Sequence, residues 1–390
     1  MLTNLHIKSF KSFLDERIEF KNLTLLCGFN NSGKSSVVQA LRMYCNAYDI
    51  GVPLLPGHGS IDELRSRLAP PNDPIVFEAC FDDGVTSEYR LSKAGFGKPE
   101  KSPVCYYLSA DRLGPQVTLP VEQRLNRFPA IGAKGEYVVG FLESLRDFII
   151  PDFLRHEKAQ GVTLEYQLVG WLGEIAPGVE LTYRIDEKRD SAYFEFNTFR
   201  PSNVGFGLSY CLPILAAVLG LTATPPKTGW KDTEFGEEVG LRWEQERKTR
   251  GTLLLIENPE AHLHPKGQTA LGKFIAAAAM CGVQFVIETQ SDHLMDGIRI
   301  AVKQSGGDTQ PDFKKKIVEG RAPDASIVPG KLDIARPGIT PDHVIFHYLE
   351  KSESGKTILQ TPILEKNGKL SFWPEGFFDQ TLKNRSVLAR

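Results

Sequence analysis

The sequence predicts an α/β fold with a mixed parallel and antiparallel sheet, an inserted α+β lobe and a small β-rich extension towards the C-terminal end. An apolar run at 23–27 ends in a glycine-rich loop and leads into a helical pattern over 34–48. Farther on, strand and helix patterns alternate, which is typical of a parallel sheet covered by helices. These later segments are 253–256, 266–281, 283–288 and 292–304.

The remaining elements are predicted from shorter patterns. Strands are expected at 2–9, 15–20, 76–81 and 104–108. The lobe is expected to hold helices at 136–149 and 163–175 and strands at 180–185 and 193–196. A strongly apolar helix is expected at 207–221, and the polar stretch 225–251 is interpreted as an exposed excursion. The last strands are expected at 344–349, 356–362 and 369–372.

This succession divides the chain into four parts. Residues 1–115 form the first half of a head, 116–200 the inserted lobe, 201–305 the second half of the head, and 306–390 the C-terminal extension. Because the two halves of the head are separated in sequence, we expect them to meet only in the folded chain.

Composition sets further limits on function. With 41% hydrophobic residues the 390-residue chain can bury a large core, and its net charge of -2 demands no polyanionic partner. The six scattered cysteines show no metal spacing, and no run of about 18 apolar residues occurs, so we expect a cytoplasmic protein without membrane contact. Two basic runs are interpreted as solvated loops, with nucleic-acid binding the less favoured alternative: Lys314 to Lys316, and Arg242, Arg247, Lys248 and Arg250.

The loop after the first buried strand predicts phosphate binding. Gly28 to Ser35 match GxxxxGK[ST] in full, and a chance match is disfavoured because an apolar run precedes the loop and an amphipathic helix follows it. Glycines allow the turn that aims backbone N–H groups at phosphate, Lys34 supplies positive charge, and the Ser35 hydroxyl reaches Mg²⁺. The residues expected to hold ATP are Gly28, Asn30, Asn31, Ser32, Gly33, Lys34, Ser35 and Ser36.

The second half of the chain supplies acidic groups. The apolar run 253–256 ends at Glu257, and a strand ending in a carboxylate suits the hydration shell of Mg²⁺. We therefore expect Ser35 and Glu257 to form the Mg²⁺ site. The strand 283–288 ends in polar groups, including Gln290, that are expected to sense the terminal phosphate.

About 220 residues separate Lys34 from Glu257, which is the spacing of ABC-type ATPases with an inserted lobe. The loop, the segment Glu257 to Pro265 and the segment Thr289 to His293 resemble the prokaryotic AAA15-type ATPases, relatives of the "overcoming lysogenization defect", RecF and SMC proteins. Three further segments carry the resemblance: Tyr107 to Arg112, Asn203 to Ser209, and Phe372 to Gln380. The last is similar to the tail of stand-alone ATPases in phage-defence loci, such as the ATPase subunit of Septu.

The resemblance implies a homodimer with its sites at the subunit interface. Two glycines and a serine before an apolar helix offer N–H groups to an anion, although a simple glycine turn before a core helix would look the same. In the family this signature segment binds the γ-phosphate held by the other subunit. The residues expected to do so here are Ser202, Asn203, Gly205 and Gly207, and on sequence grounds Gly207→Glu would prevent ATP-dependent association.

Two departures from the family predict slow hydrolysis. Asn258 stands where the family has its catalytic glutamate, and an amide cannot accept a proton from water. Gln290 stands where many relatives have a histidine. Either Glu260 replaces the missing base, or ATP acts mainly as a clamp. The expected catalytic set is Lys34, Glu257, Glu260 and Gln290.

Three functions remain open at this point. The favoured one is an ATPase that regulates an effector encoded nearby, expected to be a nuclease, in anti-phage defence or DNA transactions. The alternative is a RecF-like clamp on DNA or RNA, which requires a basic groove made by residues such as Arg112, Arg124 and Arg127. A third, a small-molecule kinase or NTPase acting alone as a monomer, is disfavoured by the signature glycines Gly205 and Gly207.

Overall fold

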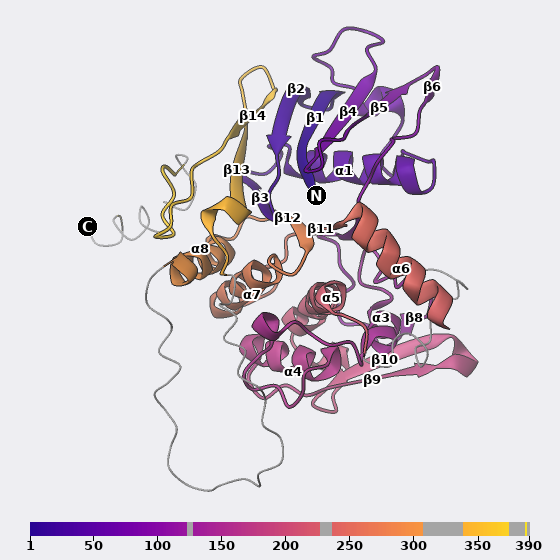
Figure 1. Cartoon of the computed structure of the whole chain (residues 1–390), viewed down its shortest axis with the longest axis vertical. Helices are drawn as coiled ribbons and strands as arrows, with labels where there is room; N and C mark the ends of the chain where they lie inside the picture. The colour runs from indigo at the N-terminus through magenta and orange to yellow at the C-terminus, as the bar shows by residue number, and fades with distance from the viewer. Residues whose placement is uncertain (123–127, 227–235, 307–337, 374–386, 388–390) are drawn as a thin grey trace, which may run out of the picture.

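The computed structural model describes residues 1–122, 128–226, 236–306, 338–373 and 387, and all statements below concern these residues. Three sheets and the helices packed on them build an α/β structure (Figure 1). The mixed strand directions, the inserted lobe and the β-rich C-terminal segment agree with the predicted fold class.

The central sheet has six strands in the order β14-β13-β3-β12-β11-β7. Its strands are β3 (Leu23–Gly28), β7 (Val104–Leu108), β11 (Thr252–Glu257), β12 (Val283–Glu288), β13 (Val344–Lys351) and β14 (Thr357–Gln360). All neighbours pair in parallel except the edge strand β14, which is antiparallel to β13. The C-terminal extension therefore continues the central sheet, directly beside the strand that leads into the phosphate loop.

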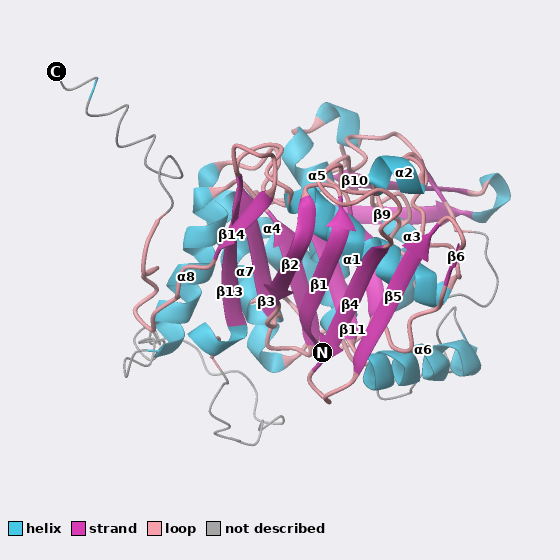
Figure 2. Ribbon diagram, turned by 90° about the horizontal axis from the view of Figure 1, so that it is seen from above, coloured by secondary structure: helices cyan, strands magenta, loops and turns pink. Residues whose placement is uncertain are grey.

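A second, antiparallel sheet lies above the central one, and helix α1 (Lys34–Asp49) lies between them (Figures 1 and 2). Its strands are β1 (Leu2–Phe10), β2 (Phe13–Glu19), β4 (Ile75–Phe81), β5 (Thr86–Ser92) and β6 (Gly95–Phe96). Strand β11 is buried on both faces: Leu253 and Leu255 pack on the α1 side, while Leu254 and Ile256 pack on the opposite side. Such a strand reads as a continuous apolar run.

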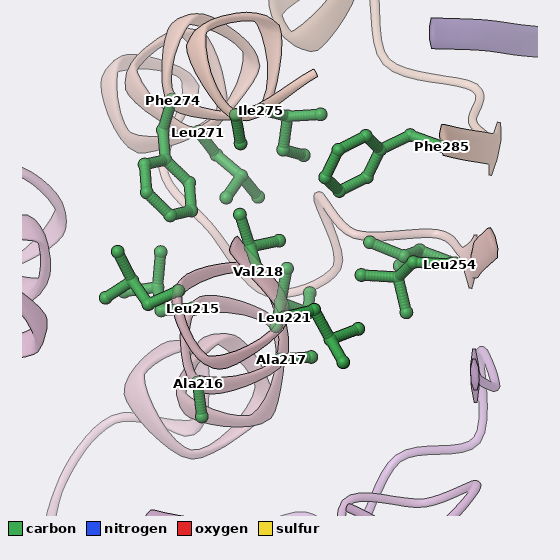
Figure 3. Close-up of a cluster of buried hydrophobic side chains, with 14 of the residues drawn as sticks. Leu215, Ala216, Ala217, Val218, Leu221, Leu254, Leu271, Phe274, Ile275 and Phe285 are labelled. Atoms are coloured by element: carbon green, nitrogen blue, oxygen red, sulfur yellow. The ribbon is translucent and has the colours of Figure 1, made fainter. Parts of the chain in front are cut away.

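The inserted lobe covers the opposite side of the central sheet, together with a layer of helices (Figure 1). The lobe contains β8 (Leu119–Pro120), α3 (Val138–Leu145), α4 (Leu164–Ile175), β9 (Leu181–Asp186) and β10 (Ser191–Phe196). The helices are α5 (Phe206–Thr222), α7 (Pro265–Ala278) and α8 (Asp292–Gly306). Figure 3 shows α5 contributing Leu215, Val218 and Leu221 to a cluster with α7 and strands β11 and β12. The short helix α2 (Ile61–Leu64) and the 3₁₀ turns Asp152–Leu154, Glu187–Arg189, Pro201–Asn203 and Pro341–His343 complete the described elements.

The stretch interpreted as an exposed excursion contains a helix instead, α6 (Gly236–Arg250). Val239 and Trp243, four residues apart, are both buried, and the Trp243 indole donates a hydrogen bond to the Tyr106 hydroxyl at 2.8 Å. The basic run on this helix is no solvated loop either. Arg250 binds the Asp49 carboxylate and the Ser102 carbonyl, while Arg247 donates to Thr252. Lys314 to Lys316 lie outside the described residues.

Two smaller expectations also differ from the structure. The strand predicted at 369–372 is absent from the described residues, where only an isolated bridge joins Leu364 to Leu370. Strand β5 is not among the strands expected from the sequence; it lies between β4 and β6 and alternates buried and exposed side chains. Most of the tail similar to the defence ATPases, from Pro374 onward, lies outside the described residues.

Candidate nucleotide-binding site

The glycine-rich loop joins β3 to α1, as its sequence predicts. Gly28 and Gly33 have φ angles of 137° and 112°, which residues with a side chain rarely adopt. The space is closed as well: a Cβ atom on Gly28 would lie 2.1 Å from the Leu349 carbonyl oxygen, and one on Gly33 would lie 2.6 Å from the Thr357 hydroxyl. Both glycines are therefore required by backbone conformation and by the close approach of the C-terminal strands.

Lys34 lies inside the loop. Its side chain is buried, and its ammonium group donates to the carbonyl oxygens of Gly28 at 2.9 Å and Phe29 at 2.8 Å. Burial lowers the pKa of this lysine. Helix α1 has no side-chain cap and no acidic residue in its first turn, so its N–H groups are available to an anion.

Ser35 and Glu257 were predicted to serve the metal together, but a different carboxylate contacts Ser35 in the structure. The Ser35 hydroxyl donates to the Glu288 carboxylate at 3.0 Å, because β12 lies between β3 and β11 in the sheet. Glu257 lies one strand farther away, where it accepts from the Tyr107 hydroxyl at 3.1 Å and the Ala110 amide at 3.3 Å. A direct role of Glu257 at the metal stays a prediction. Glu288, the last residue of the strand expected at 283–288, is the carboxylate that contacts Ser35.

Glu288 is poorly solvated. Its side chain is 6% exposed, and its second carboxylate oxygen has no hydrogen-bond partner among the described residues. Burial raises the pKa of Glu288 to about 7, with the nearby charge of Glu257 adding to the rise, while the Ser35 hydrogen bond and the Lys34 charge oppose it. Mg²⁺ prefers oxygen ligands, so the Glu288 carboxylate beside the Ser35 hydroxyl is a suitable ligand for it.

The raised pKa predicts a pH-dependent gain in stability for Glu288→Gln, measured without nucleotide and in EDTA. The unfolded chain releases this proton near pH 4.5 but the folded chain only near 7, so ionisation destabilises the fold as pH rises through this window. The variant escapes that cost. We expect little gain in the free energy of unfolding below pH 4.5 and a gain of up to about 3 kcal/mol at pH 8.

Urea denaturation at several pH values measures this difference. Glu353→Gln removes a carboxylate from an exposed position and serves as the control. Its effect on the free energy of unfolding is expected to be the same at every pH. A gain for Glu288→Gln that is the same at pH 5 and pH 8 would contradict the assignment of the raised pKa to Glu288.

The other predicted catalytic residues lie at the same edge of the sheet. The Gln290 amide side chain donates to Asn30 in the loop at 2.8 Å, and its backbone N–H donates to Glu260 at 2.9 Å. Burial raises the pKa of Glu260. Asn258 has a φ of 44°, and its N–H donates to the Glu288 carbonyl at 2.8 Å. Gln290 thus connects Glu260 to the phosphate loop.

The loop lines one wall of a cavity of about 630 Å³. Its positively charged lining residues are Lys11, Lys34, Arg65, Arg67 and Lys351, and its acidic ones are Glu63 and Glu288. This excess of cations over acids suits a polyanionic ligand such as a triphosphate. Lys351 and the cavity's arginines carry no recognisable motif, so sequence reasoning missed them.

The predicted signature segment lies elsewhere in the chain. Ser202 and Asn203 form a short 3₁₀ turn, and Gly205 precedes helix α5, which has no side-chain cap and no acid in its first turn. None of these residues lines the loop cavity. The surroundings of Gly205 are open, whereas a Cβ on Gly207 would lie 2.7 Å from the His262 carbonyl oxygen. One copy of the chain therefore does not bring the signature to its own phosphate loop.

The clamp alternative requires residues such as Arg112 in a basic groove, and the structure does not place Arg112 in one. The residue is 1% exposed, and its guanidinium donates to the carbonyl oxygens of Ser109, Tyr210, Glu257 and Asn258 at 2.7–3.2 Å. These hydrogen bonds connect the end of β11 to helix α5, and the buried guanidinium cannot contact a nucleic acid. Arg124 and Arg127 lie outside the described residues.

Comparison with protein families agrees with this geometry. Residues 1–80 match the family AAA_15, described as an AAA ATPase domain, and residues 174–296 match AAA_21, described as "AAA domain, putative AbiEii toxin, Type IV TA system". Both matched families are AAA-type ATPase domains. Its C-terminal residues 339–388 match DUF3696, described as a protein of unknown function. No curated protein matches this chain.

Solved structures with a similar fold include two SMC heads and RecF. An SMC head bound to the C-winged helix domain of ScpA is 13% identical with a TM-score of 0.49, covering 94% of this chain and 98% of its own. A head bound to the C-terminal domain of ScpA derived from Pyrococcus furiosus is 11% identical with a TM-score of 0.48, covering 100% and 99%. RecF with ATPrS is 13% identical with a TM-score of 0.38, covering 75% and 93%.

Proposed function

We propose that this ATPase is a nucleotide-operated switch. It binds ATP with Mg²⁺, dimerises around the nucleotides and thereby regulates a partner effector, a nuclease encoded nearby, in anti-phage defence or a DNA transaction. When bound, Mg²⁺ neutralises phosphate charge and orients the triphosphate. Lys34, Ser35 and the N-terminus of α1 hold the phosphates, and Glu288 and Glu257 form the acidic side.

The observation that carries the proposal is the separation of the two anion-binding segments. The phosphate loop and the signature segment each present uncapped helix N–H groups, yet the signature lies outside the loop cavity of its own chain. A second copy is the simplest source of the missing contact. Large apolar side chains are exposed in both segments, Phe29 at 52% and Phe206 at 55%, and a dimer interface would bury them.

The site favours slow hydrolysis. Asn258 cannot act as a general base, and Glu260, the other candidate, accepts a hydrogen bond from the Gln290 N–H and does not line the loop cavity. We expect turnover below about 1 per second, under the usual range for enzymes. Phosphate release at saturating ATP and Mg²⁺ measures it, with Lys34→Ala as the background control. Turnover of tens per second would contradict a clamp-like role.

Regulation of an effector is supported by one comparison. The family matched at 174–296 is described with a toxin–antitoxin system, which agrees with a role in a multi-component system. Copurification of the neighbouring gene product with the ATPase, in the presence and absence of ATP, tests this part of the proposal.

The burial of Arg112 makes the clamp alternative less favoured. A basic groove would need Arg112 at the surface, and Arg112 is buried among backbone carbonyls. A DNA affinity that falls steeply with salt would restore this alternative.

A further inference from the structure

The C-terminal hairpin, defined here as β13, β14 and the turn between them, packs directly against the phosphate loop. Strand β13 pairs in parallel with β3 up to the loop, where Leu349 is opposite Gly28. On β14, the fully buried Thr357 hydroxyl donates to the Ser32 carbonyl at 2.9 Å, and its N–H donates to Ser12. The hairpin thus holds the backbone of the loop in place.

The hairpin also carries a positive charge to the loop. Lys351, the last residue of β13, is exposed, and its ammonium group donates to the Asn31 side chain at 3.1 Å. Lys351 lines the cavity together with Ser354 and Gly355 of the turn. An ammonium group has three donors, and this contact uses one of them.

The resting contacts of Lys351 resemble those of Lys34. Among the described residues, neither lysine forms an ion pair, and both donate to neutral oxygen atoms of the same loop. A neutral acceptor competes poorly with phosphate, since charge-assisted hydrogen bonds are roughly twice as strong as neutral ones. By contrast, Lys356 of the same hairpin is paired with Glu16 at 2.7 Å and does not line the cavity.

The turn is fixed well enough to position this charge. The Ser352 N–H donates to the Lys356 carbonyl, the Gly355 N–H donates to the Ser352 carbonyl, and the Ser352 hydroxyl contacts Ser354 at 2.9 Å. Gly355 has a φ of 81°, as this turn requires. The Lys351 side chain therefore projects from a closed hairpin rather than from an extended loop.

We propose that Lys351 is a second phosphate-binding cation and that the C-terminal hairpin forms part of the nucleotide-binding site. This deepens the proposed function and rests on it, because the ligand is the same ATP. It assigns a role to the two strands within the segment 339–388. Lys351 adds positive charge beside a loop that begins more than 300 residues earlier, and Thr357 holds the backbone of that loop. Nucleotide binding would draw Lys351 from Asn31 to the phosphates.

Titration of the full-length protein with a fluorescent ATP analogue and Mg²⁺ at several salt concentrations tests the proposal. Lys351→Met is expected to weaken binding about tenfold and to flatten the salt dependence, because one charge contact is lost. Lys351→Arg, which keeps the charge, is expected to remain within about threefold of wild type. Lys356→Met removes an equal charge from the same hairpin and is expected to remain within about twofold.

The outcomes separate this proposal from the proposed function. If wild type binds and Lys34→Ala does not, but Lys351→Met binds like Lys356→Met, the role of Lys351 is wrong and the ATPase proposal stands. An equal loss in Lys351→Met and Lys351→Arg, with unchanged salt dependence, would also overturn it, because Lys351 would then only brace Asn31. If wild type binds no nucleotide, the proposed function itself is wrong. Lys351 is exposed, so both variants are expected to fold, and their melting temperatures without nucleotide check this.

Discussion

Lys34→Ala is expected to abolish ATP binding, with a loss of at least about 100-fold in affinity. The ammonium group of Lys34 is buried within the loop, and its present partners are two backbone carbonyls of that loop. Triphosphate would replace them as a charge-assisted acceptor in a poorly solvated place, where removal of one charged partner costs about 3 kcal/mol or more. Isothermal titration with ATP and Mg²⁺ measures the loss.

The structure also predicts that this variant folds. Among the described residues, Lys34 donates hydrogen bonds only to Gly28 and Phe29, so its removal does not break a contact between distant elements. A melting temperature close to that of wild type in the absence of nucleotide is the control. Affinity within threefold of wild type in a folded variant would show that Gly28 to Ser35 is not the phosphate site.

Gly205→Glu is expected to leave ATP binding intact and to prevent ATP-dependent association. Nothing lies within 4 Å of a Cβ atom at this position, so the larger side chain is accommodated without strain. A carboxylate at the start of α5 is harmless within one chain, because it lies at a helix N-terminus. Across the proposed interface it would repel the phosphates held by the partner. Light scattering with ATP and Mg²⁺ measures association, and Gly205→Ala is the matched control that should dimerise.

Position 207 is the less suitable place for this test, although the sequence alone favours Gly207→Glu. A Cβ at Gly207 would lie 2.7 Å from the backbone oxygen of His262, so any substitution disturbs the fold before it reaches a partner. Normal dimerisation of Gly205→Glu would mean that the signature assignment is wrong.

Local patterns were sufficient to predict most elements of the head. The phosphate loop and the strand ending at Glu257 were identified because the residues that define each motif are consecutive in the sequence. The helix at 236–250 was misinterpreted because, among its described residues, only Val239 and Trp243 have buried apolar side chains and the rest of the helix is mostly polar. A pair of apolar residues at helical spacing is a weak signal among many charges.

Contacts between distant segments could not be predicted in the same way. The pairing of Ser35 with Glu288 follows from the insertion of β12 between β3 and β11, and strand order is not contained in any local pattern. The burial of Arg112 depends on carbonyl oxygens from three separate segments. Lys351 reaches the loop only because β13 adds to the sheet beside β3.

The most direct test of the account is the mass of the purified wild-type protein in solution, measured by light scattering with and without ATP and Mg²⁺. A nucleotide held between the loop of one copy and the signature of another predicts a monomer of 43.4 kDa that becomes a dimer when ATP and Mg²⁺ are added. A protein that binds ATP tightly and yet keeps the mass of a single chain at every concentration would contradict it.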